Sequence, residues 1–203
     1  VPPTGRVALA SESGGMGLAV VTAAGRLHLG LSSFVSVGNH IDVTVNDLLE
    51  YWEQDQATDV ILLYLETVVD PHRFRLIAKR VGKKKPIVVM KAGRTSAGQS
   101  AAGSHTAALA TNETAIAALF KQCGVIRAAT LDEFLALATG LSKQRLPSGC
   151  RVGIVTNSGG PGVLCADSCA AEGLTVPELS KETQAVLASF LPPTASLNNP
   201  VDV

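Results

Sequence analysis

The chain has 203 residues, of which 46% are hydrophobic and 17% are charged, and its 17 basic side chains balance 17 acidic ones. A net charge near zero gives no electrostatic case for binding nucleic acid or an acidic membrane surface. No apolar stretch approaches the roughly 20 residues that a transmembrane helix needs, and residues 1–5 do not resemble a signal peptide. We therefore expect a cytoplasmic protein with a sizeable core. Because the chain lacks an initiator methionine, we interpret it as part of a longer polypeptide.

Strands and helices are predicted to alternate over residues 1–141. The apolar pattern places strands at Val7–Ala10, Leu29–Val37, Asp59–Leu65, Pro86–Lys91 and Val125–Ile126, and helices at Gly15–Ala24, Val45–Glu53, Pro71–Arg80, Asn112–Cys123 and Leu131–Leu141. Asp59–Leu65 is almost wholly apolar, which is typical of a parallel strand buried on both faces. The segment Ala92–Gly103 is rich in small residues and is predicted to be a loop. This order predicts an α/β fold, a flavodoxin-like, doubly wound parallel sheet.

A second, incomplete unit of the same type is predicted after a linker. By composition we assign residues 1–141 to the first domain, 142–150 to the linker and 151–203 to the second domain. The second domain has a strand after Arg151, a helix, a short strand near Thr175–Val176, a helix at Lys181–Phe190 and an irregular tail. Two strands cannot complete such a sheet. We expect its exposed edge to be covered by other parts of the polypeptide or by a second copy of the chain.

One glycine-rich motif occurs twice at a constant offset. Arg6–Gly17 reads RVALASESGGMG, and Arg151–Gly162 reads RVGIVTNSGGPG. In each copy an apolar run leads through Ser-Gly-Gly into a predicted helix, whose first backbone N–H groups and dipole favour an anion such as phosphate. The candidate phosphate-binding residues are Ser13, Gly14, Gly15, Ser158, Gly159 and Gly160. The alternative is purely structural, with the serines as helix N-caps and the glycines forming tight turns.

Ligands of such sheets bind beyond the carboxyl ends of the strands. Gly38, Asn39 and Asp42 follow the second predicted strand and are candidates for contacting substrate or for ordering their loop. Glu66 follows the buried strand, and His105 lies in Gly-Ser-His-Thr. A neutral imidazole is a good nucleophile towards phosphoryl groups, and a carboxylate on its second nitrogen would fix its tautomer.

Both of these candidates also have a structural interpretation. Glu66 could be a strand-end residue that pairs with Lys91 or Arg94, and His105 could be a hydrogen-bonded surface residue.

The four cysteines predict no metal site. Cys165 and Cys169 are four residues apart on a predicted helix, but their neighbours are apolar and no second pair of soft ligands has suitable spacing. We expect packed free thiols, which suit a reducing compartment.

Six motifs together resemble the NDP-forming acyl-CoA synthetases, which are relatives of the succinyl-CoA synthetase α chain. The motifs are Ser13–Gly15, Ser36–Asn39, Leu63–Glu66, Lys91–Arg94, Ser104–Ala107 and Asn157–Gly162, in order over nearly the whole chain. The resemblance implies that acid, CoA and ATP are interconverted with acyl-CoA, ADP and phosphate. The phosphoryl group would rest on His105, with Glu66 as its carboxylate partner, and both Ser-Gly-Gly turns would bind phosphate.

The same resemblance implies partners that this chain lacks. A CoA-binding Rossmann domain and an ATP-grasp domain, in the same polypeptide or in a partner subunit, would bind the nucleotide with Mg²⁺ and most of the CoA, so the chain should be inactive alone. Glu12 and Met16 depart from the family pattern, where Gln and a small or apolar residue are common. Glu12 would weaken a phosphate site if its side chain pointed inward.

Two other functions compete with this interpretation. Some protein lysine acetyltransferases carry a similar region as a ligand-sensing module, although such regions often lack the histidine that this chain retains at His105. A serine hydrolase with Ser13 as its nucleophile is the remote alternative. The chain lacks the glycine two residues before that serine, and a duplicate at Ser158 would serve no purpose for a single nucleophile.

Overall fold

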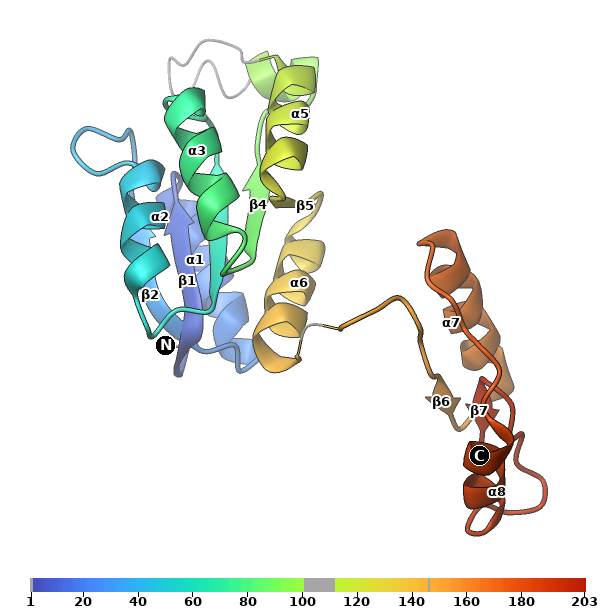
Figure 1. Ribbon diagram of the computed structural model, residues 1–203. Helices are drawn as coiled ribbons and strands as arrows, with labels where there is room; N and C mark the ends of the chain where they lie inside the picture. The colour runs from blue at the N-terminus through green and yellow to red at the C-terminus, as the bar shows by residue number, and fades with distance from the viewer. Residues whose placement is uncertain (1, 101–111, 146) are drawn as a thin grey trace. The chain divides into compact units, whose positions relative to one another are not determined.

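The computed structural model describes residues 2–100, 112–145 and 147–203. The chain divides into two units, Val1–Arg145 and Leu146–Val203, each with its own contacts (Figure 1). None of the helices within the described ranges is both long and apolar enough to cross a membrane.

The first unit is a parallel sheet flanked by helices (Figure 1). Its named elements are β1 (Thr4–Ser11), α1 (Gly14–Arg26), β2 (Leu31–Ser36), α2 (Val45–Gln54), β3 (Val60–Leu65), α3 (Pro71–Val81), β4 (Ile87–Lys91), α5 (Glu113–Cys123), β5 (Ile126–Ala128) and α6 (Leu131–Lys143). The strand order is β2-β1-β3-β4-β5, and every adjacent pair is parallel. This confirms the predicted flavodoxin-like sheet.

Alternate strand residues pack into two separate cores. On one face, Ile61, Leu63 and Val89 pack with side chains of α2, α3 and α5. On the other face, Leu62 and Val88 pack with side chains of α1 and α6. Because both faces of the central strands are covered, their residues are apolar without alternation, as the sequence predicted for β3.

Local capping explains where several helices begin. Thr44 and Asp47 form a capping box at α2, Asp70 precedes Pro71 at the start of α3, and Asn112 and Thr130 accept hydrogen bonds from the first turns of α5 and α6. The caps predicted at Asn112 and Thr130 are confirmed. Each side-chain acceptor satisfies a backbone N–H group that the helix itself leaves unpaired.

Two differences from the predictions concern the loop after β4 and the start of the linker. Residues 96–100 are helical rather than part of a loop, because Thr95 caps them: its Oγ1 accepts from Gly98 N at 3.1 Å and its carbonyl accepts from Gln99 N at 2.8 Å. Small residues such as those of this segment do not rule out a capped helical turn. Helix α6 continues through Lys143, so residues 142–143 belong to the helix rather than to the linker.

The second unit contains β6 (Val155–Thr156), α7 (Gly159–Ala171), α8 (Lys181–Ala188) and β7 (Val201–Asp202). The tail predicted to be irregular contains β7, which pairs in parallel with β6 through bonds from Val201 N to Ile154 O and from Val203 N to Thr156 O. The strand predicted near Thr175 is reduced to an isolated bridge with Arg151. Pairing with β6, rather than local composition, makes the tail extended.

Candidate functional site

The turn from β1 into α1 is built by two serines. The buried Ser11 hydroxyl donates to Ser13 O at 2.6 Å and accepts from Ser13 N at 3.2 Å, while Ser13 Oγ accepts from Met16 N at 3.3 Å as the helix cap. The described residues offer no hydrogen-bond partner to the N–H groups of Gly14 and Gly15. Ser13 is therefore an N-cap, and the adjacent N–H groups form a start of α1 that can receive an anion.

The second copy of the motif repeats this geometry around Thr156. Thr156 Oγ1 donates to Ser158 O at 2.8 Å and accepts from Ser158 N at 3.1 Å. The last glycine of each motif is also equivalent, since a Cβ at Gly17 would lie 2.7 Å from Phe34 Cζ and one at Gly162 would lie 3.0 Å from Thr156 Cγ2. In both copies this glycine lets the helix approach side chains of its own sheet closely.

The two copies differ in the charge beside the helix. Ser158 makes no side-chain cap bond, and a Cβ at Gly159 would lie 3.2 Å from a carboxylate oxygen of Asp202. This acidic side chain of β7 therefore lies beside the first residue of α7. The positive end of the helix dipole stabilises a negative charge at this position. A phosphate at this turn would have to share it with the Asp202 carboxylate.

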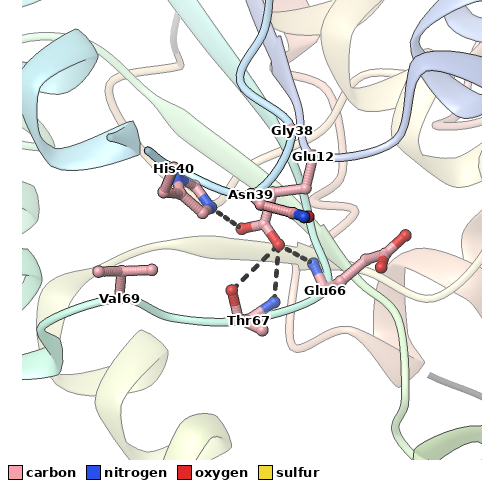
Figure 2. Close-up of a pocket in the computed structure, with 7 residues that line it drawn as sticks. All are labelled: Glu12, Gly38, Asn39, His40, Glu66, Thr67 and Val69. Carbon is pink, nitrogen blue, oxygen red and sulfur yellow. Dashed lines mark hydrogen bonds and ion pairs between the residues drawn. The ribbon is translucent and has the colours of Figure 1, made fainter. Parts of the chain in front are cut away.

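A cavity of about 200 Å³ lies beyond the carboxyl ends of β1, β2 and β3 (Figure 2). Its lining residues are Glu12, Gly38, Asn39, His40, Glu66, Thr67 and Val69. The structure thus brings together three of the candidates, Gly38, Asn39 and Glu66, whereas Asp42 is exposed and does not line the cavity. In Figure 2 the Glu66 side chain points away from the paired Glu12 and His40.

Glu12 is the most heavily engaged residue of this cavity. Its Oε2 accepts from Glu66 N and Thr67 N, each at 2.8 Å, and from Thr67 Oγ1 at 3.2 Å. Its Oε1 lies 3.0 Å from His40 Nε2, and both side chains are about 95% buried (5% and 6% exposed). The side-chain hydrogen bonds of Glu12 therefore go to the loop after β3, and its close contact with His40 lies on the same side, so neither is directed to the start of α1.

Lys91, at the end of β4, holds the other side of Glu66. Its Nζ donates to Glu66 O and to Ala92 O, each at 2.6 Å. Burial lowers the pKa of this amine. The ion pair considered between the Glu66 side chain and Lys91 or Arg94 is absent among the described residues, because Lys91 contacts the Glu66 backbone and Arg94 Nη1 donates to Ala129 O at 3.4 Å.

Sequence reasoning missed His40, Thr67 and the clamping role of Lys91. Their signal was weak because each lies near a different strand end. The departure at Glu12, a charge inside an otherwise small-residue turn, was the one visible hint. His105, the candidate nucleophile, lies outside the described residues.

The cysteines are free thiols that differ in their exposure to solvent. All four are free, with Cys123 and Cys169 buried and Cys150 and Cys165 exposed, so the predicted packing is wrong for the latter two. No cluster of three or more His, Cys, Asp or Glu side chains within the described ranges could hold a metal ion.

The parallel sheet and its glycine turn define a flavodoxin-like domain of the kind found in succinyl-CoA ligases. The chain belongs to that family: the model of the succinyl-CoA ligase-like flavodoxin domain matches residues 4–141, and the model of the Ligase-CoA domain matches residues 152–203. This confirms the family resemblance that the six motifs carried.

Several curated relatives match this chain over its whole length. The α subunit of ADP-forming acetate–CoA ligase II from Pyrococcus furiosus is 45% identical over 100% of this chain and 44% of that protein, and the ADP-forming acetate–CoA ligase of Methanocaldococcus jannaschii is 43% identical over 29% of its length. The acetyl-coenzyme A synthetase 1 of Candidatus Korarchaeum cryptofilum, solved with phosphate and ADP, matches with a TM-score of 0.93 at 36% identity, over 100% of this chain and 44% of that one. The chain therefore spans less than half the length of these relatives.

Proposed function

We propose that this chain is the phosphohistidine-bearing part of an NDP-forming acyl-CoA ligase, an acid–thiol ligase that interconverts acid, CoA and ATP with acyl-CoA, ADP and phosphate. Support comes from the family and from relatives that are ADP-forming acetate–CoA ligases. The observation that carries the proposal is the position of Glu66. It follows β3, next to the strand that leads into the glycine turn, at the edge where such sheets bind ligands.

In this proposal the reaction is a phosphoryl transfer to His105, assisted by Glu66 and by the start of α1. In the direction of ATP formation, phosphate displaces CoA from acyl-CoA to give an acyl phosphate. The His105 imidazole attacks the phosphorus of this acyl phosphate, the acid leaves with the bridging oxygen, and the phosphoryl group then passes from the imidazole nitrogen to ADP. The Glu66 carboxylate orients the imidazole and stabilises its positive charge. Ser13, Gly14 and Gly15 offer N–H donors and the positive end of α1 to the phosphoryl oxygens.

The remaining candidates have supporting roles in the proposal. Ser158, Gly159 and Gly160 form a second phosphate-binding turn. Gly38 and Asn39 shape the cavity wall towards substrate, and Asp42 orders their loop from outside.

We further propose that a CoA-binding Rossmann domain and an ATP-grasp domain complete the enzyme in the cytoplasm. Both would lie outside this chain, which covers 44% and 29% of two relatives. Mg²⁺ would be held with the nucleotide there.

The test is labelling of the complete enzyme with γ-labelled ATP and Mg²⁺, followed by peptide mapping. We expect a label that is stable in alkali, labile in acid, carried by the peptide with His105 and lost in His105→Ala. We expect Glu66→Gln to slow labelling by about 10²-fold, within the range for a lost acid–base partner. An enzyme that binds CoA and nucleotide but takes no label would reject the proposal and favour a ligand-sensing role.

A further inference from the structure

The backbone of Glu66 is held from both sides by buried charged residues. We propose that Glu12 and Lys91 are positioning residues that fix the direction in which the Glu66 side chain leaves the sheet. This inference rests on the proposed function, in which the Glu66 carboxylate orients His105. It adds roles for two residues that touch Glu66 only through its main chain or the adjacent Thr67.

The contact from the β1 side holds the N–H groups of the peptides before and after the Glu66 Cα. Glu12 Oε2 accepts from Glu66 N and Thr67 N at 2.8 Å, and the Thr67 hydroxyl adds a third donor at 3.2 Å. Hydrogen bonds to a carboxylate are shorter and stronger than neutral ones, and burial strengthens them further. Glu12 therefore holds the loop at the point where β3 ends.

The contact from the β4 side fixes the peptide after the Glu66 Cα. Lys91 Nζ donates to Glu66 O at 2.6 Å, and the residue is 6% exposed. Because β3 lies between β1 and β4 in the sheet, the two clamps approach from opposite neighbours. Fixing the N–H and the C=O of one residue fixes both of its soft dihedrals and so the direction of its Cβ.

The Glu66 carboxylate itself is left available. No hydrogen bond or ion pair from any residue in the described ranges engages its oxygens. The backbone of Glu66 is therefore held in place, while its carboxylate is available to another residue. This arrangement is expected of a group that orients a reacting residue, because the backbone alone then sets the position of the carboxylate.

His40 keeps the Glu12 side chain in place. Its Nε2 lies 3.0 Å from Glu12 Oε1, and the residue adopts a left-handed backbone with φ of 56°, a conformation that is unfavourable for a non-glycine residue. The loop beyond Thr67 is held as well, since Asn46 Nδ2 donates to Val69 O at 3.0 Å. These contacts leave Glu12 one geometry, with Oε2 facing the end of β3.

The inference is tested in the complete enzyme by the rate of His105 labelling in Glu12→Ala and Glu12→Gln. Ala removes the acceptor, whereas Gln keeps an acceptor oxygen at the same reach. Glu53→Ala is the matched control: Glu53 is also buried and paired, with Arg80 and Lys84, but lies at the far end of α2. Calorimetric thermal unfolding of each complete enzyme variant reports its stability.

We expect Glu12→Ala to slow labelling by at least about tenfold, since small misplacements of a reacting group cost up to about 10²-fold. Glu12→Gln should stay within about threefold of wild type. Glu53→Ala should lower the unfolding temperature to a similar extent as Glu12→Ala but leave labelling within about twofold. In a Glu66→Gln background, Glu12→Ala should change the rate by less than about twofold, because the effect passes through the Glu66 side chain.

Three results would overturn the inference alone: labelling of Glu12→Ala at the wild-type rate, an equal loss in Glu53→Ala, or a full effect of Glu12→Ala in the Glu66→Gln background. Wild-type enzyme without label at His105 would overturn the proposed function and this inference with it. If Glu12→Ala does not fold, Lys91→Met tests the opposite clamp, with the same tenfold loss expected and wild-type labelling counting against the inference.

Discussion

Ser13 and Ser158 occupy equivalent positions in the two motifs but differ in what their side chains do. Ser13 Oγ accepts from Met16 N at 3.3 Å, while Ser158 makes no side-chain cap bond and has the Asp202 carboxylate near its helix. A cap satisfies one backbone donor that a helix leaves unpaired, so the two serines contribute unequally to stability.

We expect Ser13→Ala to lower the free energy of unfolding of the first unit by about 1 kcal/mol in the absence of phosphate. This is measured by urea denaturation with Trp52 fluorescence. Ser158→Ala should leave the amide exchange of α7 nearly unchanged, because no cap bond is lost. Equal losses at both serines would show that capping does not distinguish them.

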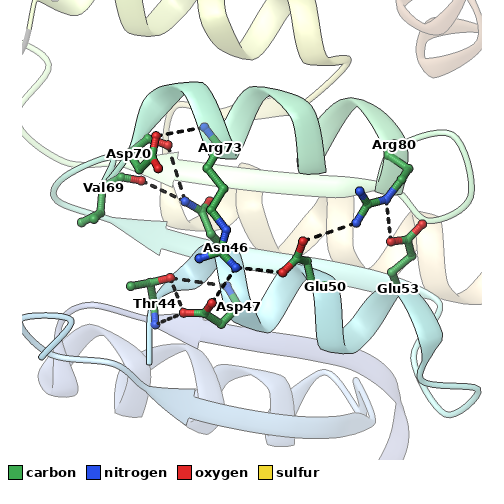
Figure 3. Close-up of polar contacts among 9 residues, drawn as sticks. All are labelled: Thr44, Asn46, Asp47, Glu50, Glu53, Val69, Asp70, Arg73 and Arg80. Carbon is green, nitrogen blue, oxygen red and sulfur yellow. Dashed lines mark hydrogen bonds and ion pairs between the residues drawn. The ribbon is translucent and has the colours of Figure 1, made fainter. Parts of the chain in front are cut away.

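At the scale of elements, a polar network joins α2 to α3 (Figure 3). Asp47 completes the capping box with Thr44, and Arg73 bridges Asp47 and Glu50 at 2.7 and 2.8 Å. The hydrogen bonds from the Thr44 side chain and backbone, followed by the one from Arg73, lower the pKa of Asp47 from 3.8 to about 2. The carboxylate form of Asp47 is therefore favoured by folding.

This lowered pKa predicts a pH-dependent loss of stability. Between the unfolded value of 3.8 and the folded value of about 2, the unfolded chain binds more protons at Asp47, so stability falls as the pH falls through that interval. We expect Asp47→Asn to be less stable at neutral pH and to lose less stability than wild type on acidification. Parallel pH profiles of Trp52-monitored unfolding for the two proteins would contradict this assignment.

The beginnings of β1 and β2 lie close together at two glycines, Gly5 and Gly30. A Cβ at Gly30 would lie 2.6 Å from Gly5 Cα and 2.8 Å from Thr4 O, which are backbone atoms that cannot rotate away. At Gly140, within α6, a Cβ would meet nothing within 4 Å.

We expect Gly30→Ala to destabilise the first unit by about 1–3 kcal/mol, as overpacking does. Gly140→Ala should stabilise it by about 0.5–1 kcal/mol, because alanine loses less backbone entropy in a helix. Urea unfolding of both variants measures the two effects. A neutral Gly30→Ala would mean that β1 and β2 can separate there without cost.

At the scale of the whole molecule, the two units have very different cores. The large buried side chains, Trp52, Phe74, Phe120 and Phe134 among them, lie in the first unit, whereas the apolar residues buried in the described part of the second unit are Ile154, Cys169 and Val201. Both strands of the second unit are two residues long. The stability of the first unit should therefore not depend on the second.

We expect a fragment of residues 1–145 to unfold within about 2 °C of the full chain, a difference well under 1 kcal/mol for a unit of this size. Trp52 fluorescence during heating measures the transition of the first unit in both proteins. A fragment that melts much earlier, or without cooperativity, would show that contacts with the second unit stabilise the first.

Much of the fold was predictable because its determinants are local. The apolar run of Asp59–Leu65 indicated a doubly buried strand, and Asn112 and Thr130 indicated the starts of α5 and α6. Helix boundaries moved by one to a few residues, and β7 was missed because its extended form comes from pairing with β6. The site was predicted in part: Glu66, Gly38 and Asn39 line one cavity, while His40 and the hydrogen bond of Lys91 to the Glu66 backbone were not predicted.

The sequence by itself determined the parallel sheet, the duplicated glycine turn and the family, because apolar runs, caps and glycine spacing act within a few residues of each other. Only the tertiary structure decided that Glu12 and Lys91 meet at the backbone of Glu66, with His40 against Glu12. These residues follow or end four different strands, and their meeting depends on the order β2-β1-β3-β4, which the packing of the crossover helices sets and no local pattern encodes.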